Sequence, residues 1–175
     1  MSRPASSSAA LPIAYGVLRI LIVLNWLMVP VILALLFMVP NERWLMSAFK
    51  LSPSPDADRL ILGMRAIAAI GLATFPLNYL SLKRLLEIVQ TVREGDPFVA
   101  ANASRLQAVA WVLLVLQLLS LVMGAIVKAI STPAHPVNIH AGFSVNGWLA
   151  VLLTFLLARV FAEGTRMRED LEGTV

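Results

Sequence analysis

The chain has 175 residues, of which 59% are hydrophobic and only 14% are charged. A water-soluble globule of this composition would expose too much apolar surface, so an ordinary soluble domain is excluded and an integral membrane protein is predicted. The chain has no cysteine, which excludes disulfides and thiolate sites, and its net charge of +4 forms no basic run, so we expect no direct binding of nucleic acid.

Four apolar stretches approach or exceed the roughly 20 residues that a helix needs to cross a bilayer. They lie at about 11–39, 58–82, 104–130 and 142–163. Because backbone polar groups need internal partners in lipid, each stretch is expected to be a helix. The sequence therefore predicts an all-α fold, a bundle of four transmembrane helices, in which residues 1–175 form a single integral membrane domain.

The first stretch is expected to be a retained anchor, because Arg19 interrupts its apolar run and the run is too long for a signal peptide. After it, Asn41 can cap a short amphipathic helix on the outer membrane surface. Its apolar side would carry Trp44, Leu45, Phe49 and Leu51.

The second stretch has no stop signal where its apolar part ends, so we expect the helix to extend into the cytoplasm over residues 83–95. On this extension, Lys83 and Glu87 are spaced as a surface ion pair. Gly95 is expected to end the helix, and Asp96-Pro97 predicts the start of a new short helix carrying Phe98 and Val99.

Small and polar residues at helical spacing predict the faces that pack together in lipid. The third stretch presents Ala103, Ala110, Gln117, Ser120, Gly124 and Lys128. The fourth presents Gly147, Ala150, Thr154 and Ala158. Beyond the fourth stretch, the tail at 164–175 begins with alternating charges, so it is expected to be a solvated helix end or a docking surface.

Lysine and arginine outside the stretches or in their end turns, counted with the adjoining tail or connection, predict the orientation, because basic residues favour the cytoplasmic side. Eight lie in the two tails and the second connection: Arg3, Lys83, Arg84, Arg93, Arg105, Arg159, Arg166 and Arg168. Four lie in the other two connections: Arg43, Lys50, Arg59 and Lys128. We therefore expect both termini to be cytoplasmic.

Polar side chains within the stretches suggest one candidate site inside the membrane. Arg19 and Arg65 have no carboxylate in the apolar interior of any stretch to pair with, so they either snorkel to lipid headgroups or face a polar interior. Such an interior would be formed by Arg19, Asn25, Arg65, Asn78 and Gln117. It would suit an anionic group such as a lipid head.

Catalysis finds little support in the sequence. His135 and His140 share a proline-containing connection with no nearby carboxylate, and no phosphate-binding loop or nucleophile with a neighbouring base is present. We therefore expect neither enzymatic activity nor a metal or cofactor.

Several segments carry a resemblance to a known family. They are Tyr79-Leu80-Ser81-Leu82-Lys83-Arg84-Leu85-Leu86, Arg93-Glu94-Gly95-Asp96-Pro97-Phe98, Asn102-Ala103-Ser104-Arg105-Leu106, and the tail from Phe161 to Val175. They resemble a bacterial family of four-pass inner-membrane proteins of unknown function, which includes YoaS-like proteins and is often encoded beside a small Cro-type helix-turn-helix regulator. The resemblance implies membrane-linked control of that regulator and no catalytic or ligand residues.

Two hypotheses follow. In the first, the chain is a protein-interaction or regulatory module whose cytoplasmic face binds a small transcription regulator through Arg84, Arg93, Asp96, Phe98, Arg105, Arg168 and Asp170. In the second, it is an anion- or lipid-binding bundle or one subunit of a transporter. Both include contacts with membrane lipids, and both leave self-association of bundles open.

Overall fold

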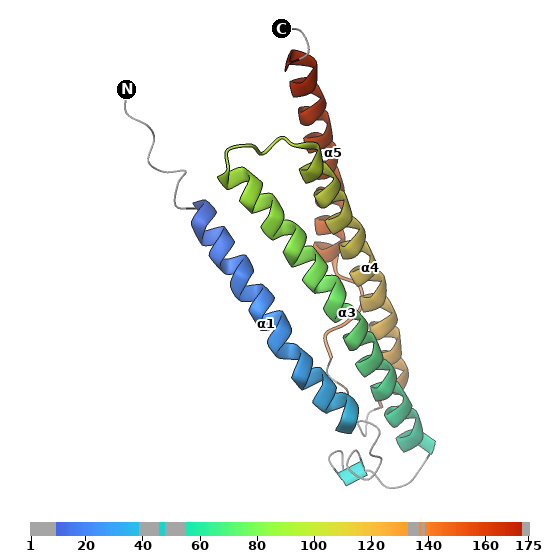
Figure 1. Ribbon diagram of the computed structural model, residues 1–175. Coiled ribbons are helices and arrows are strands. Elements are labelled where there is room, and N and C mark those ends of the chain that lie inside the picture. Colours follow the sequence, from blue (N-terminus) through green and yellow to red (C-terminus); the bar gives the residue numbers. More distant parts are fainter. Residues whose placement is uncertain (1–9, 39–45, 48–54, 133–136, 138, 173–175) are drawn as a thin grey trace.

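The computed structural model describes residues 10–38, 46–47, 55–132, 137 and 139–172. Four long helices make up nearly all of this part: α1 (Ala10–Met38), α3 (Pro55–Arg93), α4 (Ala100–Ile130) and α5 (Val145–Glu172) (Figure 1). Each is long and apolar enough to cross a membrane, and the described residues contain no strand. The predicted all-α, four-helix membrane fold is thereby confirmed. The predicted surface helix near Trp44 lies outside the described residues except for Met46 and Ser47.

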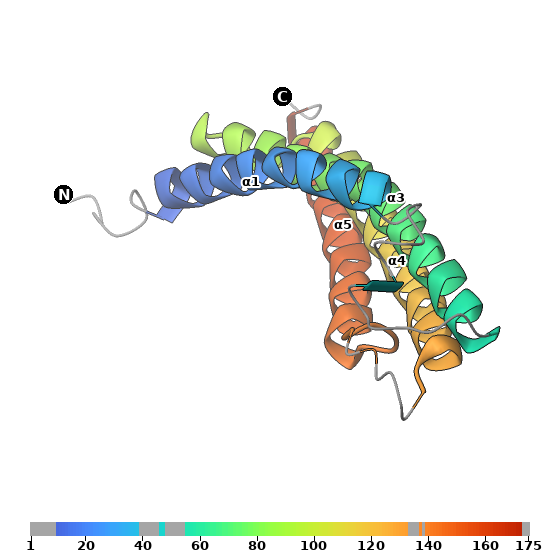
Figure 2. The same cartoon turned by 90° about the horizontal axis from the view of Figure 1, so that it is seen from below.

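The helices follow one another in a row, because extensive contacts join α1 to α3, α3 to α4, and α4 to α5. Figure 2 shows α1 lying across α3, with α4 and α5 running side by side. The start of α1, the end of α3, the start of α4 and the end of α5 share one end of the bundle, here named the terminal end (Figure 1). The described chain therefore begins, at Ala10, and ends, at Glu172, at the same end of the bundle.

All four helices are longer than a bilayer requires, since each has 28 or more residues. A 39-residue helix such as α3 is about 58 Å long, and the 28-residue α5 is about 42 Å long, against a hydrocarbon core of roughly 30 Å. The charged turns at the end of α3 (Lys83 to Arg93) and at the end of α5 (Glu163 to Leu171) lie toward the terminal end, and α3 also carries Asp58 and Arg59 near its opposite end. The extension of α3 is continuous to Arg93.

The buried core is centred on α4. Leu106, Val109, Ala110 and Val112 of this helix are buried, and the Ala110 side chain is 0% exposed. By contrast, no residue in the most apolar window of α1 is buried. A helix that is apolar all round and has no fully buried residue in its most apolar part is suited to a lipid environment. The chain therefore packs its inner helices tightly and leaves α1 at the margin.

The small-residue faces predicted from sequence are correct in part. Ala110, Gly124 and Ala158 are buried, whereas Lys128 and Ala150 are exposed. Lys128 lies in the last turn of α4, where a long charged side chain reaches water more readily than a packed interior. On α5 the buried positions are Val151, Ala158 and Thr165, spaced seven residues apart. The buried face of α5 thus includes Val151 and not the neighbouring Ala150, which is why the prediction for Ala150 was wrong.

The turn from α3 to α4 differs from the prediction. Gly95 has φ +93°, its N–H donates to the Val92 carbonyl at 3.2 Å, and the Asp96 N–H donates to the Thr91 carbonyl at 3.1 Å. This pair of bonds is the Schellman motif that ends helices at glycine. The chain then runs extended through Val99 (φ −107°, ψ 144°), and α4 begins at Ala100. The short helix predicted from Asp96-Pro97 is therefore absent, and the Asp96 carboxylate that would have capped it pairs instead with Arg168 of α5.

Candidate functional site

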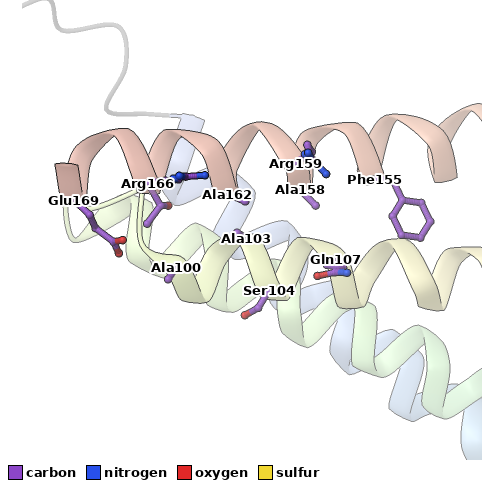
Figure 3. A pocket seen from close by; sticks show the side chains of 11 residues that line it. Ala100, Ala103, Ser104, Gln107, Phe155, Ala158, Arg159, Ala162, Arg166 and Glu169 are labelled. Atoms are coloured by element: carbon purple, nitrogen blue, oxygen red, sulfur yellow. The ribbon is translucent and has the colours of Figure 1, made fainter. Parts of the chain in front are cut away.

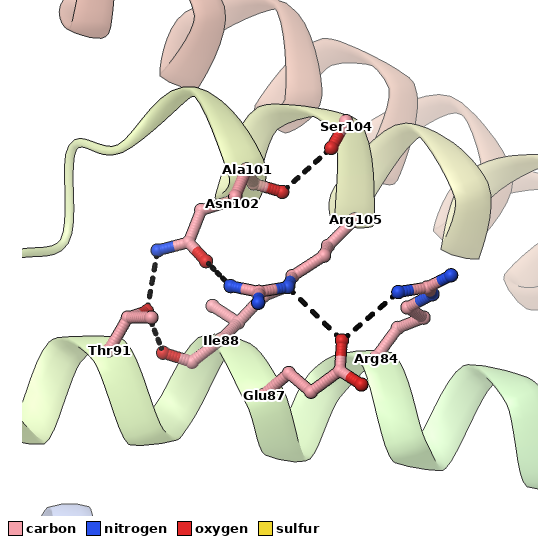
Figure 4. Close-up of polar contacts among 8 residues, drawn as sticks. All are labelled: Arg84, Glu87, Ile88, Thr91, Ala101, Asn102, Ser104 and Arg105. Atoms are coloured by element: carbon pink, nitrogen blue, oxygen red, sulfur yellow. Dashed lines mark hydrogen bonds and ion pairs between the residues drawn. The ribbon is translucent and has the colours of Figure 1, made fainter.

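A polar cluster joins α3, α4 and their connection at the terminal end (Figure 4). Its centre is Asn102, whose side chain is fully buried. Asn102 Nδ2 donates to Thr91 Oγ1 at 2.7 Å and to the Pro97 carbonyl at 3.0 Å, while Oδ1 accepts from Arg105 Nη1 at 2.9 Å. Both amide hydrogens and the amide oxygen are thus used. One buried amide therefore fixes the start of α4 against the end of α3.

Glu87 is the anionic member of this cluster. Its Oε2 accepts from Arg105 Nε at 3.1 Å and from Arg84 Nη1 at 3.1 Å (Figure 4). The Glu87 side chain is 27% exposed, so the pairs are screened only in part. The ion pair predicted between Lys83 and Glu87 is wrong, because Arg105 from the neighbouring helix and Arg84 from the preceding turn occupy this carboxylate.

A second set of contacts ties the α3–α4 connection to α5. Arg168 Nη1 of α5 donates to Asp96 Oδ1. The Phe98 ring packs against Phe161, with ring centroids 5.4 Å apart, and covers Gly164, where an added Cβ would lie 3.0 Å from the Phe98 ring. The glycine lets the ring lie close to the helix. The connection is therefore held from α4 by Asn102 and from α5 by an ion pair and an aromatic contact.

Aromatic contacts hold α1 against α3. The guanidinium carbon of Arg93, at the end of α3, lies 4.7 Å from the centroid of the Tyr15 ring, and that of Arg19 lies 5.2 Å from the same centroid. These are cation–π distances. Further along, Trp26 meets Phe75 edge to face at 5.5 Å.

The seven residues predicted for a docking surface separate into two groups. Arg84, Arg93 and Arg105 are engaged within the bundle by the contacts described above. Asp96, Phe98, Arg168 and Asp170 gather around the end of α5. Phe98 is 43% exposed despite its contact with Phe161, and Arg168 and Asp170 are exposed.

The five polar residues predicted for the membrane interior lie on different parts of the bundle. Arg19 and Asn78 are exposed, and Arg65 is half-buried. Asn25 Nδ2 on α1 and Gln117 Oε1 on α4 are buried without a hydrogen-bond partner among the described residues. The Gln117 carboxamide lies against Gly147 of α5, where a side chain would have no room. Gln117 therefore faces α5, whereas Arg19, Asn25 and Asn78 belong to the α1–α3 pair.

Two cavities lie at the terminal end. The larger, about 650 Å³, lies between the first turns of α4 and the second half of α5 (Figure 3). Four alanines and Phe155 supply its apolar lining, and its polar lining consists of Ser104, Gln107, Arg159, Thr165, Arg166 and Glu169. The smaller, about 300 Å³, is lined by Tyr15, Gln90, Arg93 and Glu94. None of the polar residues predicted for the membrane interior lines either cavity.

Several of these residues were only weakly indicated by the sequence. Asn102 and Thr91 are single polar residues, and their pairing depends on how α4 meets α3. Met167 and Leu171 are 57% and 72% exposed near the end of α5, where sequence reasoning emphasised the charges. Their spacing of four residues was the available clue, since it places both on one side of a helix.

The described residues include no group of three or more histidine, cysteine, aspartate or glutamate side chains that could hold a metal ion. His140 is exposed, and His135 lies outside the described residues.

Comparison with known proteins gives one family. The model of a family described as "Protein of unknown function (DUF2975)" matches residues 9–175, nearly the whole chain. No curated protein and no solved structure matches it.

Proposed function

The chain belongs to the DUF2975 family, and we propose that it is a non-enzymatic protein of a bacterial inner membrane whose terminal end binds a partner protein in the cytoplasm. The regulator expected beside such chains, a small helix-turn-helix protein, is the proposed partner. Binding would hold the regulator at the membrane and away from its DNA site, and a membrane signal would release it.

The observation that carries the proposal is exposed apolar surface in the charged last turns of α5. The hydrocarbon core accounts for about 20 residues of a helix, so roughly the last eight residues of α5 project from it. Met167 and Leu171 lie in that projecting part and are 57% and 72% exposed. Exposed apolar side chains outside lipid are typical of protein-interaction sites.

Neighbouring residues add charged groups and an aromatic ring to these exposed apolar side chains. We define the docking surface as Asp96, Phe98, Met167, Arg168, Asp170 and Leu171. Its apolar members would supply most of the binding energy, and its charged members would fix the orientation of the partner. Arg84, Arg93 and Arg105 would act indirectly, by holding α3 and the connection in place under this surface.

The test is co-purification of the detergent-solubilised chain with the helix-turn-helix regulator encoded beside it. Replacing Met167 and Leu171 together by alanine is expected to lower the affinity roughly tenfold or more, as loss of central apolar anchors does at other interfaces. The matched control is Glu169→Ala, which changes an exposed residue of the same helix that lines the α4–α5 cavity.

Recovery of the regulator by the wild type and the control, with loss in the double variant, is the expected result. Equal recovery by all three chains, or recovery by none, would contradict the proposal.

The second hypothesis, anion binding within the membrane or a transporter subunit, has less support. It needs Arg19, Asn25, Arg65, Asn78 and Gln117 around one space, yet Gln117 faces α5 while Asn25 belongs to α1. We therefore place the partner-binding function first.

A further inference from the structure

We propose that the cavity between α4 and α5 binds one anionic phospholipid from the membrane leaflet at the terminal end. Its phosphate would lie between Arg159 and Arg166, and an acyl chain would follow the alanine-lined floor. This site is separate from the docking surface and does not depend on the partner.

The depth of the cavity fits a lipid headgroup. Counting about 20 residues of hydrocarbon from Val145 places the membrane boundary near Thr165, between Arg159 and Arg166. On α4 the lining runs from Ala100 to Gln107, across the turn that contains Arg105. The cavity therefore spans the level at which lipid phosphates meet hydrocarbon.

The charges of the cavity favour an anion. Arg159 is the only charged residue of α5 before Glu163, and neither Arg159 nor Arg166 forms an ion pair with another residue of the described chain. The two arginines are seven residues apart, so they lie on the same side of the helix about 10 Å apart along its axis. Their flexible stems allow both guanidinium groups to approach one phosphate, for which arginine supplies a fork of donors. Glu169, at the outer rim, leaves the lining with a net positive charge.

The shape of the cavity favours a lipid over a soluble anion. Ala100, Ala103, Ala158 and Ala162 leave the space between the helices open, and Phe155 lies at the end nearest the membrane centre (Figure 3). Phosphate alone would leave this apolar floor uncovered, whereas an acyl chain would cover it. At 100° per residue, Ala162 lies roughly opposite Leu171 on α5, so lipid and partner would use opposite flanks.

The test is native mass spectrometry of the full-length chain in a neutral detergent, titrated with phosphatidylglycerol and with phosphatidylcholine of the same acyl chains. We expect one tightly retained phosphatidylglycerol. Arg159→Gln and Arg166→Gln should each weaken its binding roughly tenfold, because a charge-assisted contact with phosphate is lost. The matched control, Lys83→Gln, removes one exposed positive charge of α3 outside the cavity and should change binding less than twofold.

A second variant tests shape without changing charge. Ala162→Leu fills the cavity from an exposed position of α5 and should weaken phosphatidylglycerol binding, whereas Ala150→Leu, exposed on the same helix outside the cavity, should not. Because both arginines remain in Ala162→Leu, loss of binding there reports occupation of the space between the helices.

Three results would overturn the proposal: equal retention of the two lipids, equal losses in Lys83→Gln and Arg159→Gln, or unchanged binding in Ala162→Leu. Displacement of the lipid by inorganic phosphate at similar concentration would show a soluble-anion site and overturn the assignment to lipid.

Discussion

Asn102 joins three parts of the chain through one carboxamide: α3 through Thr91, the connection through Pro97, and α4 through Arg105. Hydrogen bonds of a fully buried amide have no water to replace them, so losing one leaves its partners unsatisfied.

At this residue we predict that Asn102→Ala lowers the free energy of unfolding by about 2 to 3 kcal/mol, because buried donors and acceptors lose their partners. Thermal unfolding in detergent, followed by circular dichroism, measures the change. Ser104→Ala is the control, since the exposed Ser104 hydroxyl donates only to the Ala101 carbonyl of its own helix. A loss in Asn102→Ala no greater than in the control would contradict the structural role of the amide.

The contacts of individual side chains were the feature least predictable from the sequence. Arg84 and Arg105 have the basic character expected of docking residues, but both are partly buried and bind Glu87. The partner of a charged side chain depends on which helix packs beside it, and four residues of spacing along one helix cannot supply that information. For this reason the sequence predicted an ion pair between Glu87 and Lys83 in place of the pairs that form.

At the scale of elements, α4 meets the segment before α5 by direct backbone contact. A Cβ added at Gly124 would lie 2.6 Å from the Gly142 Cα and 2.9 Å from the Ala141 carbonyl oxygen. Close by, Ser120 Oγ accepts from the Gly142 N–H at 3.2 Å and lies 3.1 Å from the Gly142 carbonyl oxygen. The small residues of α4 thus allow its backbone to lie close to the backbone of the segment before α5.

We therefore predict that Gly124→Ala lowers the free energy of unfolding by about 1 to 3 kcal/mol, as overpacking does elsewhere. Gly71→Ala, in α3, has nothing within 4 Å of the added Cβ and should be neutral or stabilising by up to about 1 kcal/mol. Denaturation of both variants in the same micelles compares them directly. The opposite order of stability would show that α4 does not approach this segment closely.

Helix existence was predictable from the sequence, and helix ends were predictable where glycine sets them. Four long apolar runs leave no alternative to helices in lipid, and Gly95 ends α3 through its positive φ. Asp96-Pro97 has the local form of a helix start, yet the helix begins at Ala100. The Asp96 carboxylate that could cap such a helix pairs instead with Arg168, a residue distant in sequence.

At the scale of the whole molecule, we predict that both chain ends lie on the cytoplasmic side of the membrane. The absence of native cysteine makes a direct test available, since one introduced thiol is then the only target. His140→Cys, opposite the terminal end, should react with a membrane-impermeant maleimide added to intact cells. Glu169→Cys should react only after the membrane is permeabilised.

Labelling of Glu169→Cys in intact cells, with protection of His140→Cys, would reverse the orientation and remove the docking surface from the cytoplasm. Labelling of both from outside would contradict the crossing of the membrane by α5.

The arrangement of the helices in a row has a consequence for biogenesis. Each extensive contact joins helices that are consecutive among the four, so contact order is low and no early helix must wait for the last one. As the polypeptide leaves the ribosome, α3 can pack against α1, which is inserted before it, and α4 can then pack against α3. Assembly therefore proceeds in step with synthesis, and a nascent chain arrested after α4 already contains two of the three helix pairings of the finished protein.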